Sequence, residues 1–217
     1  MSADAGHRGG GVPFDPGCRA CPRLAAHLDA VRARHPDYHC APVAPFGDPA
    51  ARLLIVGLAP GEHGANRTGR PFTGDYAGEL LYATLHAFGF ASAAVSAAAG
   101  DGLELNDCRI TNAVKCLPPQ NKPTGAEVRT CNAFLAAELA RQPPSVVIAL
   151  GRVGHDATLR ALGLRQRDHV FGHGAVHEPA GGPVIIDSYH CSRYNTQTRR
   201  LTEAMFRQVF AAARARL

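Results

Sequence analysis

The sequence predicts an α/β fold, with a central, mainly parallel four-stranded sheet flanked by helices on both faces (an α/β/α sandwich). Short apolar, β-branched runs alternate along the chain with segments of helical spacing, which is typical of strand–helix–strand units. The chain has 217 residues, of which 46% are hydrophobic and 19% charged, so it suits one domain with a single core. We expect that domain over residues 18–217, after a disordered Gly- and Pro-rich tail over residues 1–17.

Four apolar runs predict the strands, which we place at residues 52–58, 108–116, 145–151 and 182–190. Helical spacing of Leu24, Leu28 and Val31 predicts a first helix over residues 21–35. A second helix is expected over 78–90, and a closing basic helix over 198–217. The segment 169–179 adds either a hairpin or a further strand.

The helix between the second and third strands has clear start and stop signals. Thr124 and Glu127 form a capping-box pattern, and Pro143 and Pro144 end the helix. One more helix is expected after the third strand.

Three polar segments, 57–75, 115–124 and 190–200, each follow a predicted strand. In parallel sheets the carboxyl ends of the strands meet at one edge, where ligands bind. These segments therefore predict a ligand site. The first has no lysine and no GxxxxGK[ST] pattern, which excludes a P-loop nucleotide site.

The net charge of +5 and the pI near 9.0 are compatible with a polyanionic partner without requiring one. No stretch approaches the roughly 20 apolar residues of a membrane span, and the first residues have no apolar run like that of a signal peptide. We therefore expect a cytoplasmic protein, in which cysteines hold metal more often than they form disulfides.

The seven cysteines include a CxxC pair, Cys18 and Cys21, and a second pair, Cys116 and Cys131, with fourteen residues between them. Two thiolates from a tight turn and two from a distant loop can form a Cys₄ metal site. The spacing does not choose between zinc and a [4Fe–4S] cluster, and unconnected buried thiols are the alternative. We expect the others to be small hydrophobic residues: Cys40, Cys108 and Cys191.

The segments GLAPGEHGANRTGRPFTGD (57–75) and HCSRYNTQTRRLT (190–202), with the two cysteine pairs, resemble the uracil-DNA glycosylase superfamily. The similarity is greatest to its iron–sulfur family five, or type B, and it covers nearly all of the chain from Cys18 onward. The resemblance implies a structural [4Fe–4S] cluster held by the four paired cysteines. It also implies removal of uracil, and often of hypoxanthine, from DNA, which starts base excision repair.

Leu58 stands where family four has an acidic residue, so the resemblance assigns catalysis to Asp75 together with His190. His190 would donate a hydrogen bond to the departing base, and Phe72 would stack on it. The residues implied to contact the base are Gly57, Leu58, Phe72, Asn121 and His190. Each polar or aromatic residue has a structural alternative: a loop-capping aspartate, a core histidine, a core phenylalanine or a turn-forming asparagine.

A base inside a duplex must be extruded before it can react. The loop after His190 is expected to fill the resulting hole with either Arg193 or Tyr194. Cys191 and Arg199 depart from the family pattern beside this loop. DNA contacts are expected from Arg67, Arg70, Lys122, Ser192, Arg193, Tyr194, Asn195, Arg199 and Arg200.

The sequence thus predicts a monomeric DNA glycosylase without lyase activity, because lyase chemistry needs an amine nucleophile and neither Lys115 nor Lys122 lies in a motif that suggests one. Its partner would be DNA containing uracil or another deaminated base. Two alternatives belong to other classes: a lesion-binding protein with little turnover, and a Cys₄-zinc nucleic-acid module without catalysis.

Overall fold

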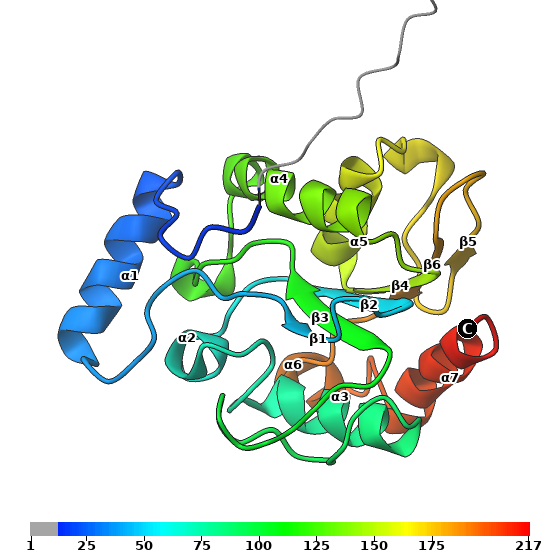
Figure 1. Cartoon of the computed structure of the whole chain (residues 1–217), viewed down its shortest axis with the longest axis horizontal. Coiled ribbons are helices and arrows are strands. Elements are labelled where there is room, and N and C mark those ends of the chain that lie inside the picture. The colour runs from blue at the N-terminus through cyan, green and yellow to red at the C-terminus, as the bar shows by residue number, and fades with distance from the viewer. Residues whose placement is uncertain (1–12) are drawn as a thin grey trace, which may run out of the picture.

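Alternate side chains of strand β2 (Leu53–Gly57) point into two different cores, and this alternation builds the layers of the fold. The computed structural model describes residues 13–217. Leu53 and Ile55 pack under helices α3 (Tyr76–Ala87) and α7 (Glu203–Arg214). Leu54 and Val56 pack under α4 (Gly125–Arg141) and α5 (Arg152–Ala161). The predicted α/β/α sandwich is confirmed (Figure 1).

The sheet has six strands in the order β1-β3-β2-β4-β6-β5. The four predicted strands are its parallel centre, where β3 (Cys108–Asn112), β4 (Val146–Leu150) and β6 (Val184–Ser188) join β2. The edge strands β1 (Phe46–Gly47) and β5 (Val176–His177) have two residues each and pair antiparallel. Strands this short show no sequence period, so β1 was not predicted. Strand β5 lies within the segment 169–179 and pairs antiparallel with β6, so this segment adds an edge strand to the sheet.

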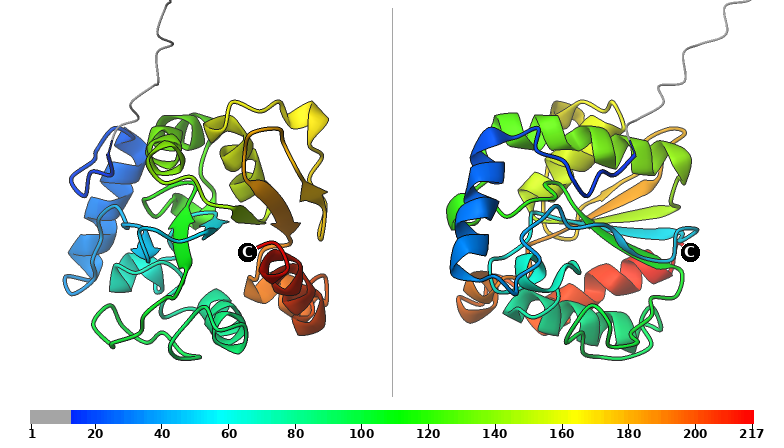
Figure 2. Two further views of the ribbon diagram at one scale, coloured as in Figure 1. Left: turned by 45° about the vertical axis from the view of Figure 1, so that its right-hand side comes forward. Right: turned by 60° about the vertical axis from the view of Figure 1, so that its left-hand side comes forward.

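Helix α1 (Pro22–Arg34) lies beside the sandwich rather than in either helical layer (Figure 2). The capping box at the start of α4 is confirmed, because Thr124 accepts from Glu127 N–H and Glu127 accepts from Thr124 N–H. Two short 3₁₀ turns, η1 (Pro119–Asn121) and η2 (Gln166–Asp168), and the one-turn helix α2 (Ala65–Thr68) lie in the connections. Among residues 13–217 there is no helix with the length and apolar character needed to cross a membrane.

The closing helix predicted over 198–217 is confirmed as α7, but it begins at Glu203 rather than at residue 198. Helix α6 (Arg193–Gln197) ends before Arg199, whose positive φ of 55° interrupts helical geometry. A new helix, α7, then starts after Thr202, whose hydroxyl accepts the N–H of Met205 at 3.2 Å. The cap residue therefore separates a short helix beside the site from the long helix that covers the sheet.

The expected tail falls largely on residues 1–12, which lie outside the described residues. Just after them, the ring of Phe14 packs edge-on against Phe134, with centroids 5.9 Å apart. Asp15 then accepts a hydrogen bond from Gly17 N–H at 2.8 Å. This contact and turn lead the chain into the cysteine pair at the start of α1.

The four parallel strands end together at one edge of the sheet. Gly57 of β2 is in register with Asn112 of β3, and Leu150 of β4 with Ser188 of β6. The three polar segments singled out in the sequence leave the sheet at this edge, as expected for parallel strands.

Candidate active site

A cavity of about 520 Å³ opens at this carboxyl edge. It draws on all three polar segments and on the start of α5, so residues far apart in sequence converge on it. Predicted site residues that line it are Leu58, Phe72, Asp75, Asn121, His190, Ser192, Arg193, Asn195 and Arg200. Gly57 lies directly behind the wall formed by Phe72 and Asn112.

Asp75 is both a helix cap and a cavity residue. Its Oδ1 accepts the N–H of Gly78 at 3.1 Å, which caps α3. Its Oδ2 faces the first loop, where a Cβ added at Gly64 would lie 2.2 Å away and one added at Gly61 3.2 Å away. Burial raises the pKa of Asp75 above the ordinary carboxyl value, against the lowering effect of the N–H groups of Gly78 and Ala77. The capping role and the position in the cavity thus coexist.

His190 follows strand β6, and no charged side chain among residues 13–217 pairs with it. Burial lowers its pKa to about 4, so the imidazole is neutral near pH 7 and has one N–H to donate. Its ring stacks near Phe72, with centroids 5.8 Å apart and planes inclined by 26°. Asn195 fixes the backbone here, since its Nδ2 donates to the His190 carbonyl at 2.8 Å.

Phe72 has a positive φ of 54°, an uncommon conformation for an aromatic residue. Close packing holds it, because a Cβ at Gly57 would lie 2.6 Å from the Phe72 ring, and one at Gly78 would lie 1.8 Å from its carbonyl oxygen. Glycine at these two positions lets the ring lie flat at the end of β2. The side chain is 6% exposed and also belongs to the core under α3.

The four paired cysteines also converge. Cys18, Cys21, Cys116 and Cys131 line a separate cavity of about 270 Å³. Burial raises the pKa of Cys116 to about 12, and the other three cysteines add to the increase, because their thiolates would repel its own. Cys40, Cys108 and Cys191 are each at most 3% exposed and belong to the apolar core clusters.

The spacing of these four sulfurs bears on the choice of metal. A tetrahedral zinc ion with bonds of about 2.3 Å holds its sulfurs about 3.8 Å apart. Across residues 13–217, three ligand atoms within 4.8 Å of one another occur only at His155, His177 and Asp187. No three cysteine sulfurs are that close. As they lie, no three of these sulfurs are as close together as the ligands of a bound zinc ion.

The uracil DNA glycosylase superfamily model matches residues 44–214, which is more than half of the chain. The chain belongs to the uracil DNA glycosylase superfamily. It is similar to the type-5 uracil-DNA glycosylase of Thermus thermophilus, with 48% identity over 91% of this chain and 92% of that protein. The type-5 enzyme of Pyrobaculum aerophilum is 41% identical over 91% of this chain and 88% of its own length. A type-4 enzyme of Sulfurisphaera tokodaii is 30% identical over 75% of this chain and 70% of its own length.

Among the cavity residues that sequence reasoning missed, Asn112 says the most about the ligand. Its side chain is in the cavity wall, 4% exposed, and its Oδ1 has no hydrogen-bond partner within the described part of the chain. A buried amide oxygen without a hydrogen-bond partner destabilises the fold unless a bound ligand donates a hydrogen bond to it. The signal that could have found it is its register: it ends β3 opposite Gly57, where the first polar loop begins.

Asn121 lies at the rim of the same cavity rather than inside it. The residue is exposed and has a positive φ of 56° at the end of η1. Lys122 follows it on the surface, where its carbonyl accepts a hydrogen bond from Arg23 at 3.2 Å.

The predicted DNA-contacting residues separate into two groups. Most lie on the surface: Arg67, Lys122, Arg193, Tyr194, Arg199 and Arg200 are exposed, and Ser192 and Asn195 are half-buried. Arg193 lies over the ring of Tyr76 at 5.1 Å, and Arg200 over Tyr189 at 4.6 Å. Tyr194 is 71% exposed.

Arg70 does not fit the prediction of a DNA contact. Its guanidinium is buried and donates to Asp101 at 2.7 Å and to Ser96 at 3.0 Å. The arginine holds the loop of residues 96–101 against the segment 57–75, so it stabilises the fold instead of facing DNA.

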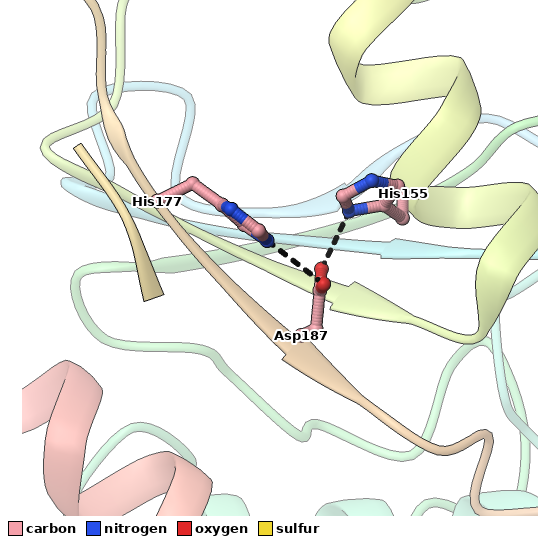
Figure 3. A group of neighbouring side chains, drawn as sticks. All are labelled: His155, His177 and Asp187. Atoms are coloured by element: carbon pink, nitrogen blue, oxygen red, sulfur yellow. Dashed lines mark hydrogen bonds and ion pairs between the residues drawn. The ribbon is translucent and has the colours of Figure 1, made fainter. Parts of the chain in front are cut away.

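His155, His177 and Asp187 form a histidine–carboxylate network in the interior (Figure 3). Asp187 of β6 contacts His155 Nδ1 at 2.7 Å and His177 Nε2 at 3.0 Å. His155 Nε2 must donate to the carbonyl of His169, 2.9 Å away, because a carbonyl only accepts. Burial alone would lower the pKa of His155, but the hydrogen bond and charge of Asp187 outweigh it and raise the pKa. The network holds the segment that carries Phe171, a further cavity residue.

Proposed function

We propose that this chain is a monofunctional DNA glycosylase, which flips a uracil nucleotide out of DNA and hydrolyses its N-glycosidic bond as the first step of base excision repair. The observation that carries the proposal is the meeting of Asp75, His190, Phe72 and Asn112 in one cavity. The type-5 relatives, named for this activity, match nearly the whole chain and support it.

Cleavage of the N-glycosidic bond leaves positive charge on the sugar and negative charge on the base. The carboxylate of Asp75 would stabilise the sugar cation and orient the attacking water. The neutral imidazole of His190 would donate its N–H to a base carbonyl as charge develops there. A charged imidazolium is not needed for this role, which fits the lowered pKa.

Phe72 would stack on the extruded base, and Asn112 would read its edge. The Asn112 amide has one acceptor and two donor hydrogens, which match the adjacent N–H and C=O groups of uracil. Hypoxanthine presents the same pair of groups, so we extend the proposal to it. Asn121 at the rim, with Gly57 and Leu58 at the end of β2, would complete the base contacts.

We propose that the four paired cysteines hold a [4Fe–4S] cluster. Their wide spacing supports it over a zinc ion, and thiolates are the ordinary ligands of such clusters. The cluster would serve structurally, because it ties the start of α1 to the loop between Asn112 and α4 and stands apart from the base cavity. A [4Fe–4S] cluster at these cysteines would also disfavour the alternative of a Cys₄-zinc module.

A lyase step is not part of the proposal. Lys115 lines the cysteine cavity rather than the base cavity, and Lys122 does not line the base cavity either. Action as a monomer stays a prediction. The cytoplasmic setting stays a prediction.

The test uses duplexes carrying one uracil, one hypoxanthine or no lesion. Strand breaks that appear only after alkali, on the lesion-containing strands, are the expected result. Breaks without alkali would contradict the monofunctional mechanism. Tight, lesion-specific binding without breaks would favour the alternative, a lesion-trapping protein.

A further inference from the structure

Lys115 is a buried lysine that the proposed base chemistry does not use. Its side chain is 2% exposed, three residues beyond Asn112 and directly before Cys116. Only two of the 23 basic residues are lysines, and the other, Lys122, is on the surface. Lysine carries a compact point charge where arginine carries a broad planar one. In a chain so rich in arginine, this position is occupied by the compact cation.

The contacts of Lys115 leave its neighbourhood with excess positive charge. Its Nζ donates a hydrogen bond to Thr111 Oγ1 and lies 3.9 Å from the carboxylate of Glu138. Glu138 is already bound by Arg109, whose Nε lies 2.5 Å from Oε1. Two cations thus share one carboxylate, and the side chain of Glu138 is only 8% exposed. An uncompensated interior charge is costly, so a further negative group is expected nearby.

The four-cysteine cavity is where that group would lie. Lys115 lines this cavity, and its backbone N–H donates to Cys131 Sγ at 3.2 Å. Four thiolates around an iron–sulfur core carry more negative charge than the core neutralises. Net charge near such a centre, and hydrogen bonds to its sulfurs, set its reduction potential.

We propose that Lys115 is the buried counter-ion of the four-cysteine metal centre, so that its charge stabilises the thiolate-bound cluster and raises the cluster's reduction potential. The inference rests on the proposed [4Fe–4S] cluster. Arg109 and Glu138 are part of the same charge balance: two cations share one carboxylate, so one positive charge remains for the cluster.

The test compares three variants of the full chain, each purified with its metal centre. Lys115→Met removes the cation and nearly keeps the side-chain shape, whereas Glu138→Gln removes the anion. Lys122→Met is the matched control, because it removes the only other lysine, which is exposed. The measurements are iron and sulfide content and the midpoint potential of the cluster.

The sign of each shift decides the outcome. We expect a more negative potential in Lys115→Met, a smaller positive shift in Glu138→Gln, and no shift in Lys122→Met. An unchanged potential in Lys115→Met with full iron content would overturn the proposal. If that variant loses its cluster or fails to fold, Glu138→Gln still decides, and a negative shift or none would overturn it. Wild-type protein without iron would refute the cluster itself, whereas uracil excision is measured separately.

Discussion

A Cβ atom at position 64 would lie 2.2 Å from Oδ2 of Asp75, so Gly64 leaves the space that this carboxylate occupies. Any side chain there must displace the carboxylate or the loop. The same carboxylate caps α3 through its other oxygen. One residue of the first loop and one at the start of a helix are thus fitted to each other.

Gly64→Ala should therefore impair catalysis without changing any chemical group in the cavity. Displacement of a catalytic group by about 1 Å can cost about 100-fold in rate, and we expect a loss of that order in single-turnover uracil excision. Gly100→Ala is the matched control, because no atom lies within 4 Å of a Cβ at that position. Equal rates for Gly64→Ala and wild type would show that the carboxylate position is not critical.

The pH dependence should reflect the two shifted groups. Asp75 must be deprotonated, and its raised pKa means that excision declines as pH falls through that pKa. His190 has a pKa of about 4, so it is neutral throughout pH 6 to 8 and its titration does not change the excision rate there. We expect single-turnover rates with an acid limb and then a plateau through neutral pH. A limb centred near pH 6.5, the ordinary histidine value, would contradict the neutral His190.

Asn112→Ala should weaken recognition of the base. Loss of a hydrogen bond to a buried amide costs about 1–3 kcal/mol, or about 5- to 150-fold in kcat/KM. The side chain is buried with a free acceptor, so the loss should fall on uracil and hypoxanthine alike. Steady-state kinetics on both lesions measures it. Full activity on both would remove Asn112 from the base contacts.

Tyr194 is the better placed of the two candidate wedge residues. Its side chain is 71% exposed, whereas the guanidinium of Arg193 lies over Tyr76. Tyr194→Ala should slow excision from duplex DNA by about 10- to 100-fold, since unstacking costs a few kcal/mol. Excision from single strands, which leave no hole to fill, should change little. A larger duplex-specific loss in Arg193→Ala would assign the wedge to the arginine.

The sequence predicted the parallel centre of the sheet and the place of the cavity, because short β-branched runs and Gly-rich loops are local features that the sequence shows directly. It missed what depends on distant contacts. Nothing local distinguishes Asn112 from an ordinary strand residue until β2 and β3 are paired. Arg70 looked like a surface charge, and only the approach of the loop carrying Asp101 buries it. The break before α7 needed the cap at Thr202 to outweigh continuous helical spacing.

The measurement that tests the central claim most directly is the single-turnover rate of uracil excision by Asp75→Asn, alongside its affinity for uracil-containing duplex. Asparagine keeps the shape of the side chain and removes its charge. The account predicts a fall in rate by orders of magnitude with affinity largely retained. An Asp75→Asn protein that excises uracil at the wild-type rate would contradict it.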